Sequence, residues 1–242
     1  MFYSKQHDLY INKLNNGEHF KYSRFNDGEI IAASRINING SNCDNHKYFP
    51  EMGNELEKIL LNYSYSDTYV FEHYKHWYNT NNLVHGYLDN IYQQNKNLKF
   101  LDDDFIRKTH EIKPYLFIDL IESFRDKKIV IIGADYLKSL NKFFDFEYIE
   151  IPRLNCYLSK DKIISDIKER NKKEDNNIYL FSASMATNII IDEFKEDNNN
   201  SYIDWGSVWD TFFIGKNYSY LRKRSSSNME IYKNYYNKYL IL

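Results

Sequence analysis

The chain has 242 residues with a formal net charge of −2, and 43% of its residues are hydrophobic, which suits one folded domain with an ordinary core. The balanced charge argues against a protein whose main role is to coat nucleic acid, and no apolar run approaches the roughly 18 residues of a membrane span. Two cysteines cannot form a disulfide framework, and the start of the chain lacks the apolar stretch of a signal peptide, so we expect a reducing, cytoplasmic location.

The first half of the chain predicts one strand and several helices. HFKYSRF, residues 19–25, has the pattern of a strand that leads into a helix start at GEIIAASR. Apolar residues that recur at spacings of three and four predict further helices, over residues 50–63, 84–97 and 114–124.

The second half alternates short apolar runs with helix-like stretches. The apolar runs are bounded by turn residues and lie at 127–135, 146–152, 176–184 and 200–207. Helical spacing of apolar residues covers the stretches between them, at 135–144, 159–173 and 185–197. This alternation predicts an α/β fold: a Rossmann-like, mostly parallel sheet flanked by helices, with ligands at the carboxyl ends of the strands.

The end of the chain, residues 222–242, predicts a polar break followed by an amphipathic tail helix, within a single domain over 1–242. Arg222, Lys223 and Arg224 make the start of this tail basic. A basic amphipathic end suits peripheral contact with an anionic membrane, and with it a lipid-linked acceptor. A terminal helix docked on the domain is the simpler explanation of the same pattern.

The stretch SRFNDGEI gathers Arg24, Asp27 and Glu29 around Gly28. On an extended segment, residues two apart project from the same face, so the two carboxylates would repel each other unless a cation lay between them. Mg²⁺ or Mn²⁺ takes one or two carboxylates and completes its shell with phosphate oxygens and water. Arg24 could add a phosphate contact, and Gly28 would let the backbone approach a ligand closely. A surface turn before a helix explains the same residues without a metal.

FSASMAT predicts the end of a buried strand and the start of a helix, where backbone N–H groups could bind an anion. The hydroxyls of Ser182, Ser184 and Thr187 could add donors, although capping and close packing explain the same residues. Gly133 ends another predicted strand, where a turn or helix packing is as good an explanation as a nucleotide contact. Neither GxGxxG nor GxxxxGK[ST] occurs, which excludes the usual dinucleotide and P-loop motifs.

DWGSVWD places Asp204 at the carboxyl end of a predicted strand, followed by Ser207 and Asp210. Asp204 could orient a sugar hydroxyl or act as a base on an acceptor. A helix cap at Asp204, with Trp205 and Trp209 in the core, is the structural alternative.

Three other clusters favour structural explanations. His73 and His76 beside Trp77 have no matching further ligands for zinc, so a half-buried helical face is a better interpretation than an acceptor-binding surface. The acids of LDDDF, residues 101–105, are typical of a solvated helix start rather than a second metal site. A loop is a better interpretation than a catalytic dyad for the remaining cluster, which comprises Cys43, Asp44 and His46.

In their order along the chain, several segments resemble glycosyltransferases of the GT-D fold, from about residue 20 to residue 215. SRFNDGE resembles their RFGDGE signature, KKIVIIG their IVIVxG segment, and YIDWGSVWD their C-terminal IDxGSxxD. SASMATNIIIDEF resembles their ALGPTATVLAxxL segment, and FPEMGNELEKIL and EYIEIPRLNCYLSKDKII are similar to two intervening stretches. The chain departs from the family at Asn26, where the family has Gly, at Ser184-Met185, where it has Gly-Pro, and at Ser207, where some members have His.

The resemblance implies a metal-dependent, hexosyltransferase-like enzyme that uses Mn²⁺ or Mg²⁺ and a nucleotide diphosphate sugar, by analogy a UDP-sugar. It implies that Asp27 and Glu29 form the metal and donor site, and we add Asp204 as a third catalytic candidate. The acceptor would be a glycan, a glycoprotein or a lipid-linked sugar, and we expect no nucleic-acid partner. The candidate donor contacts are Arg24, Gly28, Gly133, Ser182, Ser184, Thr187 and Ser207.

Two alternative functions stay open. A metal-dependent phosphodiesterase or nuclease could use the same acids, but it would need a denser acidic cluster than the first half shows clearly. A non-catalytic nucleotide-binding interaction module would bind nucleotide without turnover, and metal would add little to that binding.

Overall fold

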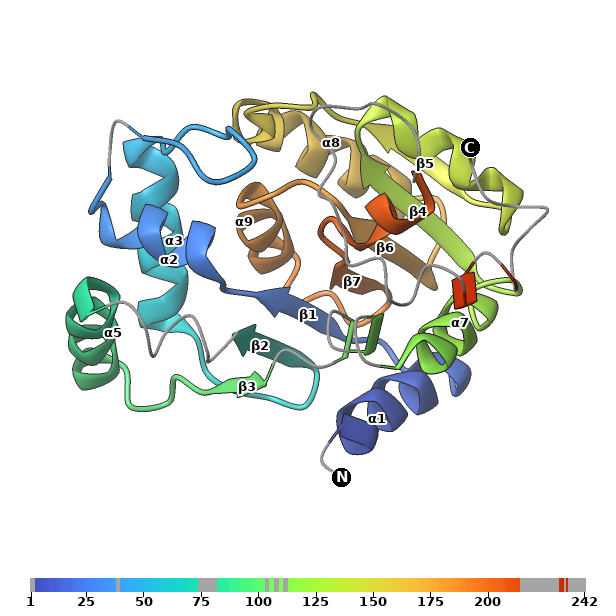
Figure 1. Ribbon diagram of the computed structural model, residues 1–242, viewed down its shortest axis with the longest axis horizontal. Coiled ribbons are helices and arrows are strands. Elements are labelled where there is room, and N and C mark those ends of the chain that lie inside the picture. Colours follow the sequence, from blue (N-terminus) through green and yellow to red (C-terminus); the bar gives the residue numbers. More distant parts are fainter. Residues whose placement is uncertain are drawn as a thin grey trace.

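The computed structural model describes residues 3–37, 40–73, 82–102, 105–106, 109–110, 113–213, 231–232 and 234. The interpretation of His76 and Trp77, and almost all of the predicted tail helix, therefore lie outside the described residues. Within them, the chain forms a seven-stranded sheet with the order β3-β2-β1-β7-β6-β4-β5 (Figure 1). Every pair of neighbouring strands is parallel, which confirms the predicted α/β class.

The strands are β1 Lys21–Arg24, β2 Tyr69–His73, β3 Phe100–Asp102, β4 Lys128–Gly133, β5 Glu147–Glu150, β6 Asn177–Phe181 and β7 Ser201–Asp204. The α-helices are α1 Tyr3–Asn15, α2 Asp27–Ser34, α3 Pro50–Asn62, α5 Asn82–Gln94, α7 Pro114–Glu122, α8 Lys160–Asn171 and α9 Ala186–Glu193. Three 3₁₀ helices complete the described elements: η1 Asp135–Lys142, η2 Cys156–Ser159 and η3 Val208–Phe213.

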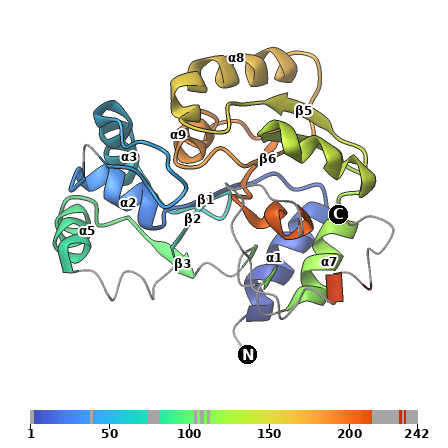
Figure 2. The same ribbon diagram turned by 45° about the horizontal axis from the view of Figure 1, so that its top comes forward.

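The sheet is buried on both faces, as its continuous apolar strands predict. Side chains alternate along a strand, so Val130 and Ile132 of β4 join one hydrophobic cluster while Ile129 and Ile131 join the other. Helices α2, α3, α5, α8 and α9 cover the first cluster, and α1, α7, η1 and η3 cover the second (Figure 2). The two edge strands are more accessible, since the residues of β5 are partly or fully exposed and Phe100 and Leu101 of β3 are partly exposed.

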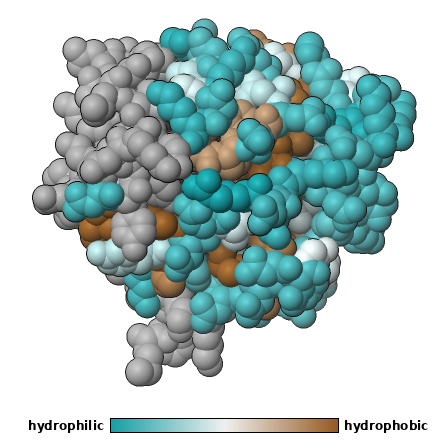
Figure 3. All heavy atoms as spheres, turned by 90° about the vertical axis from the view of Figure 1, so that its right-hand side faces the viewer, coloured by the Kyte–Doolittle hydropathy of each residue, from teal (hydrophilic) through white to brown (hydrophobic). Residues whose placement is uncertain are grey.

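The surface is polar by comparison with this interior. Hydrophilic residues cover most of the described part of the face shown in Figure 3, and hydrophobic residues show between them in patches. None of the described helices has the length and apolar character needed to cross a membrane.

The predicted elements of the second half are confirmed, while the first half contains elements that the sequence did not reveal. Each apolar run contains one of the strands β4 to β7, although the predicted helix at 135–144 is the 3₁₀ helix η1. The prediction missed α1, β2 and β3. His73, expected on a helical face, lies in the fully buried strand β2. The expected helix start at 101–105 is also wrong in its first residues, because Leu101 and Asp102 belong to β3 and pair with β2.

The chain order predicts a ligand site at the carboxyl edge of the sheet. From β1 the chain adds β2 and β3 on one side, and β4 to β7 then form the other side, with β7 against β1. The chain moves outward from β4 to β5 but inward from β6 to β7, so the direction in which strands are added reverses between the neighbouring strands β4 and β6. In open parallel sheets, ligands bind outside the carboxyl ends of the strands at such a reversal.

Candidate functional site

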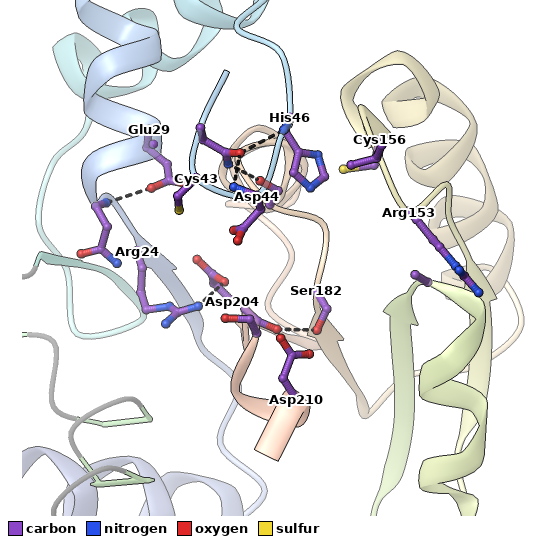
Figure 4. Close-up of a pocket in the computed structure, with 18 of the residues that line it drawn as sticks. Arg24, Glu29, Cys43, Asp44, His46, Arg153, Cys156, Ser182, Asp204 and Asp210 are labelled. Carbon is purple, nitrogen blue, oxygen red and sulfur yellow. Dashed lines mark hydrogen bonds and ion pairs between the residues drawn. The ribbon is translucent and has the colours of Figure 1, made fainter. Parts of the chain in front are cut away.

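A pocket lies at this carboxyl edge, over the ends of β1, β7 and β6 (Figure 4). One wall is formed by the start of α2 and by the loop over residues 40–48, and the other by the start of η1 and by the loop over residues 152–156. The segments that follow β6 and β7 form its floor. Segments far apart in the sequence thus meet where the sheet topology predicts a ligand site.

Asp27 and Glu29 both line the pocket from the first turn of α2. Asn26 caps this helix, and its backbone N–H donates a hydrogen bond of 3.0 Å to Glu29 Oε2, as in a capping box. The extended geometry expected for these residues is therefore wrong, because both are helical and do not share a face by strand alternation. Asp27 and Glu29 therefore lie at a helix start, as the structural alternative predicts, and they also line the same pocket.

Glu29 lies in a concentration of negative charge. Burial raises the pKa of its carboxyl from an ordinary value of 4.5 to about 7, and the negative charges of Asp204 and Asp27 add to this effect. A carboxylate in such surroundings is stabilised by a nearby cation, so these residues fit a divalent metal. Within the described part of the chain, no group of three or more His, Cys, Asp or Glu side chains is arranged to hold a metal alone. A cation here would complete its shell with water and substrate oxygens.

Arg24 and Asp204 join the ends of the two central strands. Arg24 Nη2 donates to Asp204 Oδ1 at 2.9 Å, and the two side chains are 10% and 9% exposed. Such a buried pair depends on both partners, because either charge alone would be costly to bury. Both residues line the pocket. The contact of Arg24 with a phosphate and the catalytic role of Asp204 stay predictions.

Gly206 makes room for this ion pair, a role that the sequence pattern did not predict. It has φ of +60°, and a Cβ built on it would lie 1.9 Å from Arg24 Nη2. Both features disfavour a side chain at this position, and an added Cβ would displace the end of the Arg24 side chain. The signal in the sequence was a glycine two residues after a buried strand, within DWGSVWD.

We expect Gly206→Ala to destabilise the protein by more than a positive φ alone requires. Gly17 is the matched control, since it has φ of +71° with nothing within 4 Å of a built Cβ. Gly17→Ala should cost about 1 kcal/mol from backbone strain, and Gly206→Ala a further loss of about 1 kcal/mol from the displaced guanidinium. Urea unfolding of both variants measures this difference. Equal losses would mean that the guanidinium moves aside at no cost.

The segment after β6 contributes two predicted hydroxyls to the floor. Ser182 Oγ donates to the Gly206 carbonyl at 2.7 Å, which ties the ends of β6 and β7 together. Ser184 Oγ accepts a hydrogen bond of 3.2 Å from Asn42 Nδ2. Ser184 also has φ of +52°, a conformation that favours glycine, and the sequence resemblance to GT-D glycosyltransferases predicts glycine at this position.

The structure separates the other predicted donor contacts into two groups. Gly28 and Ser207 line the pocket, whereas Gly133 and Thr187 are not among its lining residues. A Cβ on Gly133 would lie 2.4 Å from Leu137 Cδ1, so this glycine allows η1 to pack against β4. Thr187 is 1% exposed within α9. Gly133 and Thr187 therefore match the structural explanations of the sequence pattern, which are helix packing and close packing against the sheet.

The loop over residues 40–48 is a loop, as expected, but it forms part of the pocket. Asn42 organises it by accepting hydrogen bonds of 3.0 Å from the backbone N–H groups of Asp44 and His46. His46 Nδ1 then accepts from the Asn155 N–H at 3.1 Å, so the proton of the neutral ring is assigned to Nε2. Burial lowers the pKa of His46, which favours this neutral form. The loop is thereby fixed to the opposite wall.

Cys156 and Arg153, which line the pocket from the opposite wall, have defined partners. Cys156 Sγ donates to the Ala183 carbonyl at 2.6 Å, and burial raises the pKa of this thiol to about 12, which argues against a role as nucleophile. Cys43 is exposed, and no disulfide joins the two cysteines. Arg153 forms a two-point ion pair with Asp135, with distances of 2.7 and 2.8 Å.

Comparisons with known proteins identify the fold. No protein-family model matches the chain, and no curated protein sequence matches it significantly. A new glycosyltransferase (DUF1792) from Streptococcus sanguinis has 16% sequence identity and a TM-score of 0.63, over 90% of this chain and 85% of that chain. The domain of unknown function 1792, described as having a distinct glycosyltransferase fold, has 16% identity and a TM-score of 0.60, over 87% and 80%. A selenomethionine-substituted structure of that domain gives 18% identity with the same TM-score of 0.60. The chain therefore has the α/β glycosyltransferase fold described for DUF1792.

Proposed function

We propose that this chain is a metal-dependent glycosyltransferase. It moves a sugar from a nucleotide diphosphate sugar, by analogy a UDP-sugar, to a hydroxyl of a glycan, glycoprotein or lipid-linked acceptor. The observation that carries the proposal is the pocket at the carboxyl edge of the sheet, which Asp27 and Glu29 line from α2 and Arg24 and Asp204 line from β1 and β7. A glycosyltransferase fold with acids and a guanidinium at its ligand edge supports transfer from a charged donor.

Asp27 and Glu29 would hold Mg²⁺ or Mn²⁺, which supplies Lewis-acid stabilisation of the departing diphosphate when bound. The backbone at the start of α9, next to Ser184, would meet the remaining negative charge of the donor. Arg24 contributes positive charge in the same pocket and holds the Asp204 side chain in place through their ion pair. Asn42 and His46 fix the wall of the pocket and so keep the donor site preorganised.

A thermal-shift panel of nucleoside diphosphates and nucleotide sugars, each with and without Mn²⁺, tests this function. We expect one nucleoside diphosphate to raise the melting temperature by roughly 5–10 °C at 100 times its dissociation constant. The shift should require Mn²⁺, and Asp27→Ala combined with Glu29→Ala should abolish it. Sugar transfer from the matching nucleotide sugar should disappear in the same variant.

The control is Asp145→Ala, which removes an exposed carboxyl just before β5, and which should keep the full shift. A shift that is independent of Mn²⁺, without turnover of any nucleotide sugar, would instead support a nucleotide-binding module. Hydrolysis of a nucleic acid without sugar transfer would support a nuclease.

A further inference from the structure

Asp210 lies at the lower end of the pocket in Figure 4, on η3 and away from Glu29. Aromatic packing holds this side of the pocket, since Trp205 and Trp209 are fully buried and stack with 4.7 Å between ring centroids. Close packing of this kind fixes η3 against the sheet. Asp210, which is 6% exposed, therefore faces the pocket from a rigid element.

Tyr136 orients the Asp210 carboxylate. Its hydroxyl donates a hydrogen bond of 2.9 Å to Asp210 Oδ1, and its ring packs edge-on against Phe213 with 5.0 Å between centroids. Tyr136 lines the same pocket from η1, so the hydrogen bond joins elements that follow β4 and β7. An ionised carboxylate has lone pairs on both oxygens, so this bond to Oδ1 does not prevent the group from accepting a proton.

Four other carboxylates line the pocket, and they suit other roles. Asp27 and Glu29 lie together on α2, where the proposed metal would bind. Asp204 is engaged in a buried ion pair, and its protonation would leave the buried guanidinium without its counter-charge. Asp44 belongs to the loop over residues 40–48, whereas Asp210 is held by a 3₁₀ helix and a side-chain hydrogen bond. A proton acceptor acts best from such a fixed position.

We propose that Asp210 is the general base for the acceptor and that Tyr136 positions it; this rests on the proposed sugar transfer. The acceptor hydroxyl oxygen bonds to the anomeric carbon of the donor. The bond from that carbon to the diphosphate oxygen breaks, and its electron pair leaves with the diphosphate. The hydroxyl proton passes to the Asp210 carboxylate. Without an acceptor, water takes the place of the hydroxyl, and the products are free sugar and nucleoside diphosphate.

The test uses the full chain, Mn²⁺ and the nucleotide sugar whose nucleoside diphosphate stabilises the wild type, with nucleoside diphosphate release as the readout. Asp210→Asn should keep the melting temperature and the nucleotide-induced shift but lower turnover at least about 100-fold. Asp210→Glu keeps a carboxylate and should recover part of that turnover. Tyr136→Phe should lower turnover about tenfold with an unchanged nucleotide-induced shift. Asp145→Asn, on the exposed turn before β5, is the control and should keep wild-type turnover.

Wild-type turnover by Asp210→Asn would overturn the assignment, and so would an inactive Asp44→Asn beside an active Asp210→Asn. Equal losses in Asp210→Asn and Asp210→Glu, each with a lowered melting temperature, would make Asp210 a structural residue and also overturn it. If the wild type itself releases nucleoside diphosphate from no nucleotide sugar, the proposed function fails and this inference fails with it. The activity of the wild type therefore distinguishes the two failures.

Discussion

Replacing Arg24 by Met should lower the free energy of unfolding by about 3–5 kcal/mol, the usual cost of breaking a buried ion pair by removing one partner. Arg24 is 8% exposed and Asp204 is 6% exposed, so water replaces little of the lost interaction. Methionine keeps much of the side-chain volume, so the loss reports the unpaired carboxylate of Asp204 rather than a cavity. Urea unfolding at pH 7 in the absence of metal measures it.

The double variant Arg24→Met with Asp204→Asn separates this cause from general disruption. It removes both charges and should recover a large part of the stability lost in the single variant. Lys138→Met is the matched control, because Lys138 and Glu150 form an ion pair in which both side chains are 55% exposed. That substitution should cost at most about 1 kcal/mol. A similar small cost for Arg24→Met would show that solvent reaches the pair.

Local sequence patterns were sufficient for the second half of the sheet. Strands β4, β6 and β7 are short apolar runs between turn residues, and such runs mark strands that are buried on both faces. Strand β2 is equally buried, but its sequence YVFEH ends in Glu72 and His73, whose polar side chains do not resemble a buried strand. Tyr22 donates a hydrogen bond of 2.5 Å to Glu72, and this partner comes from a strand 50 residues away. Burial of that kind depends on tertiary contacts, which no local pattern contains.

In the candidate site, too, the sequence could predict some of the residues but not the contacts between them. Asp27 and Glu29 could be selected from their spacing and from the resemblance of SRFNDGE to the RFGDGE signature, and Asp204 from its place at the carboxyl end of a predicted strand. In a parallel sheet, all strand ends of one kind meet at one edge. The pairing of Arg24 with Asp204 joins residues 180 positions apart, and the space for it comes from Gly206. Neither the pairing nor the reason for this glycine follows from spacing. The fold therefore predicts where ligand-binding residues gather, and the packing decides which of them are engaged with each other.

Metal-free protein should become less stable as the pH rises from about 4.5 to about 7, and Glu29→Gln should remove much of this trend. The folded state raises the pKa of Glu29 to about 7 from an ordinary value of 4.5, so over this range it holds a proton that the unfolded state has lost. The stability that depends on protonated Glu29 is therefore fully present below pH 4.5 and is lost as the pH approaches about 7. The shift corresponds to at most about 3 kcal/mol, and partial exposure of Glu29 reduces the expected loss to about 2 kcal/mol.

Comparing the wild type with Glu29→Gln separates the titration of Glu29 from that of all other groups. Glutamine can still accept the capping hydrogen bond from the Asn26 N–H, so the variant should match the wild type at pH 4 and exceed its stability at pH 8 by about 2 kcal/mol, measured by urea unfolding in EDTA. Glu51→Gln changes an exposed glutamate in the first turn of α3 and should follow the wild-type curve. A constant difference between wild type and Glu29→Gln across this pH range would contradict the raised pKa of Glu29. Mn²⁺ should stabilise only the wild type at pH 8, because an ionised Glu29 then gains the cation that its surroundings lack.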